Sequence, residues 1–149
     1  METTEVDALI DRRLKTLILI YLWGALLEDI TIFAISWIAP QVWFHLFHHS
    51  TADALEIALL RRSGGQWLAF AVGQAITLSQ WKKRPEWLAV AAGIRLSDLF
   101  TDLSYLIAAP SLTSFGRMLF PIFPILNLVG VVIFLKAYQQ AISRKPNHV

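Results

Sequence analysis

The stretch WLAVAAGIRLSDLFTDLSYLIAA, residues 87–109, says more about the fold than any other part of the chain. As an α-helix rising about 1.5 Å per residue, it is long enough to cross a hydrocarbon layer about 30 Å thick. Lys82, Lys83 and Arg84 precede it and Pro110 follows it, so the apolar run has clear ends. The stretch predicts a helix that spans a membrane.

Three further stretches have the length and hydropathy of a membrane span. They are residues 17–38, which end before Pro40, residues 63–81 and residues 115–138. Hydrophobic residues make up 56% of the 149 residues and charged residues only 16%, a more apolar balance than a soluble domain usually has. The sequence therefore predicts one all-α domain, residues 1–149, that forms an integral membrane four-helix bundle.

The positive charges predict how this bundle is oriented. With four spans, both termini and the middle loop lie on the same side of the membrane. Nine Lys and Arg residues fall on that side and three on the other, so the positive-inside rule predicts a multi-pass chain with cytoplasmic N- and C-termini. The nine are Arg12, Arg13, Lys15, Lys82, Lys83, Arg84, Lys136, Arg144 and Lys145, and the three are Arg61, Arg62 and Arg117.

Two features are expected at the membrane interfaces. Residues 41–62 are too polar to cross, and Ser50 looks like a helix N-cap with Asp53 in the first turn. We expect a short amphipathic helix here, between the first two spans, with an ordinary connector as the alternative. Tryptophans lie near the predicted span ends, as an aromatic belt requires, and they are Trp37, Trp43, Trp67, Trp81 and Trp87.

Five ionisable residues lie inside the predicted spans away from their ends, where a charge costs about 2.5–3.5 kcal/mol on insertion scales. They are Glu28 and Asp29 in the first span and Arg95, Asp98 and Asp102 in the third. At about 100° per residue, the three residues of the third span share one helix face. The acidic pair and Asp98 lie at the same depth, roughly 17 Å into their spans, so we expect one shared site.

The charges of this site do not balance, because four carboxyl groups face one guanidinium. At least one or two carboxyl groups should carry a proton, bind a cation or face water. A neutral carboxylic acid beside an ionised one is the arrangement used in general acid/base catalysis, and a carboxylate that exchanges protons can also drive transport. The structural alternative is an Arg95–Asp98 salt bridge that locks the bundle.

The leading hypothesis is a small membrane enzyme that acts on a lipophilic small molecule without a cofactor. The reaction would be hydrolysis of an epoxide, cyclisation or isomerisation. The alternatives are a proton- or cation-coupled transporter or channel subunit and a non-catalytic accessory subunit of a membrane complex. The partners expected are the lipid bilayer, the lipophilic molecule and a second copy of the chain; a net charge of +2 does not indicate nucleic acid. The predicted catalytic residues are Asp98, Asp102, Arg95, Glu28 and Asp29, and the predicted substrate-binding residues are Asn127, Gln74, Trp67 and Tyr105.

Short motifs resemble a known family. Residues 61–65, RRSGG, open the second span, and residues 93–96, GIRL, lie within the third. In these motifs and in its layout, the chain is similar to the small four-span bacterial proteins of the DoxX-like group. The resemblance covers the organisation of residues 38–138 and implies the four-span fold, without implying a defined reaction.

A second likeness concerns residue types alone. An Arg between two Asp residues with an Asn nearby, here Arg95, Asp98, Asp102 and Asn127, resembles the water-activating set of limonene-epoxide-hydrolase-like enzymes. In those enzymes one carboxylate takes a proton from water and a protonated one donates to the epoxide oxygen. Small membrane terpene cyclases also use buried acids on apolar substrates. The fold expected here differs from that of the hydrolases, so the likeness is an analogy.

A histidine cluster offers a weak metal site. His45, His48 and His49 match the H-x-x-H-H box of membrane di-iron desaturases, but those enzymes need about three such boxes, and this chain adds only His148. If the segment is helical, His45 and His49 could hold one metal ion, with Asp53 as a further ligand. Interfacial histidines without metal are the preferred interpretation. The chain has no cysteine, which excludes disulfides and thiolate chemistry.

Overall fold

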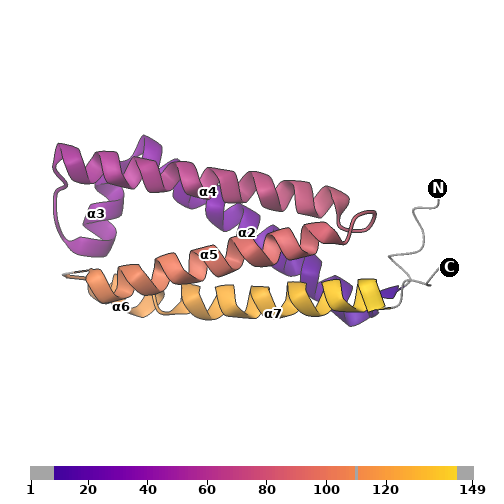
Figure 1. Ribbon diagram of the computed structural model, residues 1–149. Coiled ribbons are helices and arrows are strands. Elements are labelled where there is room, and N and C mark those ends of the chain that lie inside the picture. Colours follow the sequence, from indigo (N-terminus) through magenta and orange to yellow (C-terminus); the bar gives the residue numbers. More distant parts are fainter. Residues whose placement is uncertain (1–8, 110, 144–149) are drawn as a thin grey trace.

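The computed structural model describes residues 9–109 and 111–143, which form helices and no strand (Figure 1). The all-α prediction is confirmed for this part of the chain. Pro110, Arg144, Lys145 and His148, on which some of the predictions above depend, lie outside it. The helices are α2 (Arg12–Ile38), α3 (Pro40–His48), α4 (Ala54–Gln80), α5 (Glu86–Ala108), α6 (Ser114–Leu119) and α7 (Ile122–Ser143).

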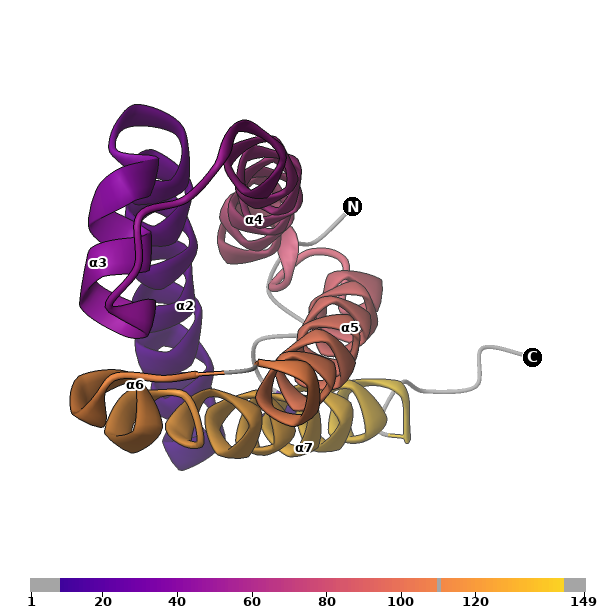
Figure 2. The same ribbon diagram turned by 90° about the vertical axis from the view of Figure 1, so that its left-hand side faces the viewer.

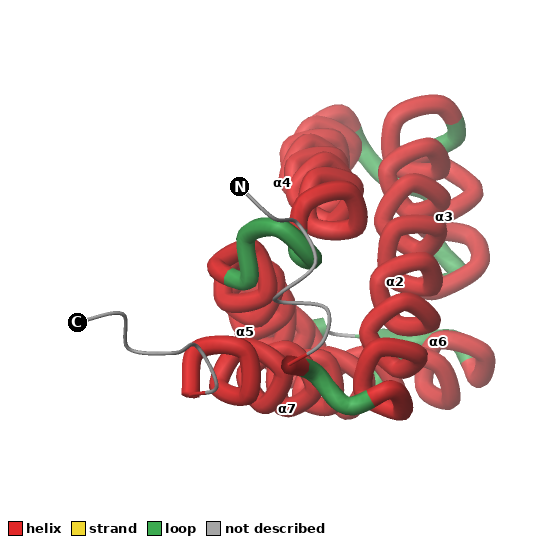
Figure 3. Tube along the Cα trace, turned by 90° about the vertical axis from the view of Figure 1, so that its right-hand side faces the viewer, coloured by secondary structure: helices red, strands yellow, loops and turns green. Residues whose placement is uncertain are grey.

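The four long helices surround a common interior in the order α2, α4, α5, α7 (Figure 2). The most extensive packing is between α2 and α4 and between α5 and α7, whereas the two pairs meet each other over smaller areas. The short helices α3 and α6 lie together at one end. Figure 3 shows the opposite end, where the connection between α4 and α5 and the C-terminal end of α7 face the viewer.

The start of α4 differs from the prediction. Asp53, not Ser50, is the N-cap: its Oδ1 accepts from the Glu56 N–H at 2.8 Å, and Glu56 Oε2 accepts from the Asp53 N–H at 2.9 Å. This reciprocal capping box satisfies two backbone donors and fixes the first turn. Residues 54–62 are therefore the first turns of one continuous helix, because nothing between them and the predicted span breaks the helix. The separate short helix is α3, which begins at Pro40.

The last predicted span is interrupted, as its prolines indicate. α6 ends at Leu119 and α7 begins at Ile122, with Pro121 between them. Proline has no N–H to donate and clashes with the preceding turn, so the helix breaks there. Phe120, beside the break, is buried and packs in a cluster with Trp43 and Phe47 of α3.

Two helical stretches, Arg12–Ile38 and Ser114–Ser143, are long and apolar enough to cross a membrane. The interior is more polar and the surface more apolar than in a typical soluble domain. Among the described residues, the exposed side chains include many large apolar ones on all four long helices, for example Trp23, Leu68, Phe100 and Leu128. The buried ones include Asp29, Ser36, Gln74, Thr77, Arg95, Asp98 and Asn127.

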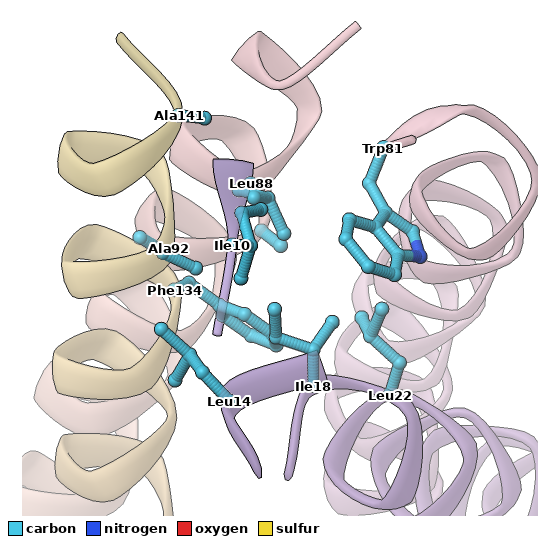
Figure 4. Packing of buried hydrophobic residues seen from close by; sticks show 11 residues of the cluster. Ile10, Leu14, Ile18, Leu22, Trp81, Leu88, Ala92, Phe134 and Ala141 are labelled. Carbon is cyan, nitrogen blue, oxygen red and sulfur yellow. The ribbon is translucent and has the colours of Figure 1, made fainter. Parts of the chain in front are cut away.

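An apolar cluster fills the bundle at the end where α4 joins α5 (Figure 4). Ile18 and Leu22 of α2 and Leu88 of α5 are fully buried there, and Phe134 of α7 packs against them. Trp81, predicted to lie in an interfacial belt, is instead fully buried in this cluster, because the α4–α5 connection turns it inward. Trp43 of α3 is likewise buried, whereas Trp37 is exposed as expected.

Candidate functional site: a carboxylate cavity

An ion-paired group lies in the middle of the bundle. Arg95 Nη2 of α5 donates to Asp29 Oδ2 of α2 at 2.8 Å, and Arg95 Nη1 lies 3.3 Å from Asp98 Oδ2 on its own helix. Gln74 of α4 also donates to Asp29 Oδ2. All four side chains are buried. The prediction that α2 and α5 bring their ionisable residues to the same depth agrees with this geometry.

Asn127 of α7 connects the second part of the group. Its Oδ1 accepts from Arg95 Nη1 at 3.1 Å, and its Nδ2 donates to Asp98 Oδ2 at 3.2 Å and to Asp102 Oδ2 at 2.8 Å. The amide thereby holds the two carboxyl groups of α5 side by side and orients both. All four long helices contribute a residue to this network.

The structure corrects one detail of the expected arrangement. Arg95 was expected between Asp98 and Asp102, but it bridges Asp29 and Asp98. Asp102 lies about two turns further along α5, and helical side chains lean toward the N-terminus of their helix, so the guanidinium is directed away from it. Asp102 has the Asn127 amide as its partner instead.

The network is not fully satisfied by protein groups. Among the described residues, the buried Gln74 Oε1 and Arg95 Nε make no hydrogen bond. Buried polar groups in a purely structural lock are expected to be paired, because an unpaired one costs about 1–3 kcal/mol. Protein groups alone therefore do not complete the network as such a lock would require.

A cavity of about 230 Å³ adjoins the network on the side of α3. Glu28, Asp29, Asp98 and Asp102 all contribute to its wall, and the lining contains no Lys, Arg or His. Glu28 makes no hydrogen bond or salt bridge with a described residue, so of these four it is the carboxyl group without a partner. The remaining lining residues are Ile32, Trp43, Leu59, Leu60, Ser63, Gln66, Trp67, Thr101, Tyr105, Phe120 and Phe123.

The mouth of the cavity lies between α4 and α5. The exposed lining residues belong to these two helices. They are Leu59, Ser63 and Gln66 of α4 and Thr101 of α5. The two helices are closest at their connection and diverge toward the α3 end (Figure 1). The apolar cluster fills the interior between the network and the end where α4 joins α5. The cavity therefore opens in the half of the bundle that holds α3.

Aromatic rings form another part of the wall, and their packing involves α3. The ring centroids of Trp43 and Trp67 are 5.6 Å apart, and those of Tyr105 and Phe120 are 4.9 Å apart. His48 fixes α3 over these rings: its Nδ1 lies 2.8 Å from the Ser111 carbonyl, and its Nε2 bonds the Tyr105 hydroxyl. A carbonyl only accepts, so Nδ1 carries a proton and donates it to Ser111.

The histidine cluster does not assemble a metal site in the part of the chain that is described. His49 follows the end of α3 with φ of 52°, so His45 and His49 do not share a helix face as a metal pair would. His48 is bonded to Ser111 and Tyr105, and Asp53 caps α4. No group of three or more His, Cys, Asp or Glu residues is placed there to hold a metal ion.

The predicted site residues divide into two sets. Glu28, Asp29, Asp98 and Asp102 line the cavity, as do the predicted substrate-binding residues Trp67 and Tyr105. Arg95, Gln74 and Asn127 lie behind the wall, bonded to protein groups.

Thr101 and Phe120 line the cavity and were not among the predicted site residues. Thr101 follows Asp98 by three positions on the same helix, a spacing that could have indicated it. Phe120 reaches the cavity only because the helix breaks at Pro121, and no local pattern in the sequence shows where the side chain points after such a break.

Comparisons of the chain with known protein families, with curated proteins and with solved structures found no match. The similarity to the DoxX-like group therefore rests on the short motifs RRSGG and GIRL and on the layout of the spans. What the chain does has to follow from the geometry and chemistry of its site.

Proposed function

We propose that the chain is a small integral membrane enzyme that crosses the bilayer four times and uses the carboxyl groups of its cavity for general acid/base chemistry on a lipophilic molecule. The observation that carries the proposal is the cavity itself. Asp98 and Asp102 lie side by side in its wall, oriented by one amide, and only Asp98 of the two contacts Arg95.

The four-span topology is supported by the distribution of polar and apolar side chains. α4 and α5 carry more charge than α2 and α7, but their outward faces expose large apolar residues such as Leu68, Val72, Phe100 and Ile107. Gln74 and Arg95, by contrast, are buried in the interior. This is the pattern expected of bundles in lipid, where ionisable residues face one another or a cavity. The positive-inside bias places the termini in the cytoplasm and the cavity toward the opposite side.

The site offers two kinds of carboxyl group. Asp98 is beside a guanidinium, which stabilises its ionised form, whereas Asp102 and Glu28 have no cation in contact. General acid/base catalysis needs one group that accepts a proton and one that donates it, positioned about the same reacting atoms. In epoxide hydrolysis, Asp98 takes a proton from water, the resulting hydroxide attacks carbon, and protonated Asp102 donates to the oxygen of the opening ring. The proton returns from Asp98 to Asp102 through solvent, so the cycle balances.

The transport and accessory-subunit alternatives gain less support. The apolar cluster beside Trp81 fills the interior on the side of the termini, so no continuous polar path crosses the described part of the bundle. The Asp29–Arg95 pair does hold α2 to α5, but a lock alone does not require a carboxylate-lined cavity beside it.

An isotope experiment tests the proposal and does not require the substrate to be identified first. The purified protein in lipid nanodiscs is incubated with a panel of terpenoid epoxides, terminal epoxyalkanes and polyenes in heavy-oxygen water or deuterium oxide. Mass spectrometry then detects hydrolysis as a gain of heavy oxygen and isomerisation or cyclisation as a gain of deuterium. We expect label in at least one probe, reduced at least about a hundredfold in Asp98→Asn and Asp102→Asn.

The matched control is Glu86→Gln, which removes an exposed carboxyl group of α5 outside the cavity and should leave labelling unchanged. Equal labelling by the wild type and both Asn variants would refute the catalytic role of these carboxyl groups. Absence of label in every probe would count against the enzyme and in favour of an accessory role.

A further inference from the structure

A second, almost wholly apolar groove of about 330 Å³ adjoins the cavity. Glu28, Ile32, Trp43 and Phe123 line both, so the two spaces share a wall at Glu28. The groove runs along α2 against α3, α6 and the start of α7, where its other residues include Leu27, Ile35 and Phe47. The groove lies on the side of the bundle formed by α2 and α7, which is opposite the cavity mouth between α4 and α5.

The charges around Glu28 favour a positive ligand. The cavity wall holds four carboxyl groups and no cationic side chain, and the nearest guanidinium, Arg95, is already bonded to Asp29 and Asn127. An anion there would meet uncompensated negative charge in a medium of low dielectric constant, where repulsion is strong. Glu28, which has no partner among the described residues, is free to pair with a cation.

The aromatic residues independently favour a positive ligand. Trp43, Trp67, Tyr105 and Phe120 all contribute to the cavity wall, and the Trp43 ring lies 5.6 Å from Trp67 and 6.1 Å from Phe120 by centroids. Aromatic faces attract cations, and the attraction reaches about 2 kcal/mol when water is excluded. Carboxyl groups combined with several aromatic rings form the type of site that recognises ammonium groups.

We propose that the cavity binds the positive centre of a lipophilic organic cation, with its apolar chain in the groove along α2. This inference rests on the proposed function and names its substrate class. The substrate is a lipophilic molecule with a single chain. It either bears an amine or has a reacting carbon that becomes positive when an epoxide or alkene is protonated. The cavity then holds the compact head of the molecule, and the groove holds a chain that lies across the bundle.

Binding measurements with three chain-matched probes test this. N,N-dimethyloctylamine, octanol and octanoate are titrated onto the full chain in nanodiscs, with tryptophan fluorescence as the readout and empty nanodiscs as the blank for partition into lipid. The amine should bind at least about tenfold more tightly than the alcohol, and octanoate should show no saturable binding. Octanoate that binds as tightly as the amine would overturn the proposal.

Variants locate the two ends of the ligand. Glu28→Gln should weaken amine binding at least about tenfold, Glu28→Asp should recover most of it, and the exposed control Glu86→Gln should have no effect. Ile35→Trp should fill the groove, so that dimethyloctylamine loses its advantage over dimethylbutylamine. Full amine affinity in a folded Glu28→Gln variant would refute the position of the positive centre. An unchanged chain-length preference in Ile35→Trp would refute the position of the chain.

Binding and turnover separate this inference from the proposed function. Amine binding without turnover of any probe would leave the ligand class standing and refute the enzyme. Turnover that the amine neither competes with nor slows would support the enzyme and refute the ligand class.

Discussion

Asp29 is the residue on which most of the polar network depends. One of its oxygens accepts from Gln74 of α4 and from Arg95 of α5, so a single side chain of α2 bonds both to its neighbour α4 and, across the interior, to α5. Asp102 is its opposite in this respect, because it accepts only from Asn127 and has no cation in contact. Two carboxyl groups of the same cavity thus contribute differently to stability.

This difference predicts different stabilities for two variants. Asp29→Asn should lower the free energy of unfolding by about 3–5 kcal/mol, because it leaves a buried guanidinium without its closer carboxylate. Asp102→Asn should leave stability unchanged or raise it, because Asp102 is in no ion pair and the neutral amide replaces a carboxyl group that no cation contacts. Thermal unfolding in mild detergent, followed by tryptophan fluorescence, measures both. Equal losses in the two variants would support the structural-lock hypothesis over the site.

At this scale the sequence predicted the members of the site better than its geometry. Helical spacing and depth were enough to bring Asp29, Arg95 and Asp98 together, because both follow from the regular rise and rotation of a helix. Which of Asp98 and Asp102 contacts Arg95 could not be predicted, because that contact depends on the direction of a long side chain. The role of Asn127 as a bridge depends on how α7 packs against α5, which no local pattern specifies.

Adjacent glycines in α4 show how closely the helices approach. A Cβ at Gly64 would lie 2.7 Å from the Trp37 ring and would also meet Ser36, whereas a Cβ at Gly65 would have nothing within 4 Å. Gly64 is buried against α2 and Gly65 is exposed. Small residues allow backbones to approach in this way in membrane bundles.

We therefore expect opposite effects from two alanine substitutions. Gly64→Ala should destabilise the protein by about 1–3 kcal/mol through overpacking against α2. Gly65→Ala should be neutral or stabilise it by up to about 1 kcal/mol, because alanine favours the helix and meets no neighbour. The unfolding midpoints of the two variants, measured side by side, test the α2–α4 interface. A stable Gly64→Ala variant would show that these helices pack less closely.

For the elements, the sequence predicted existence better than boundaries. The break at Pro121 follows from the chemistry of one residue, and so was accessible from the sequence. The start of α4 was misplaced, because Ser50 and Asp53 are both capping residues and the reciprocal bond of Asp53 with Glu56 decides between them. The seating of α3 depends on His48 and Tyr105, which are far apart in the sequence.

The whole molecule buries a polar network and exposes many large apolar side chains, and its two ends differ. The end at which α2 begins and α7 finishes is filled by an apolar cluster, and the end that holds α3 and α6 contains the cavity. If the chain crosses the bilayer four times with its termini in the cytoplasm, the connection after α3 and the connection after α4 face opposite compartments.

Single cysteines test this topology directly, because the natural chain has none. Thr51→Cys, between α3 and α4, should react with a membrane-impermeant maleimide added to intact cells. Lys82→Cys, between α4 and α5, should react only after the membrane is permeabilised. Both positions are exposed, so accessibility within the protein does not limit either reaction. Labelling of both from the same side would exclude the proposed arrangement.

The charged groups buried in the interior also have a consequence for biosynthesis. Only Arg12–Ile38 and Ser114–Ser143, among the described helices, are apolar enough to cross by themselves, and each charge at the centre of α5 opposes its insertion. In the proposed topology the ribosome delivers α2 first, so Asp29 is already in the bilayer when Arg95 emerges. The buried ion pair is then an assembly signal as well as a part of the site: an earlier span supplies the counter-ion that lets a later one leave the translocation machinery.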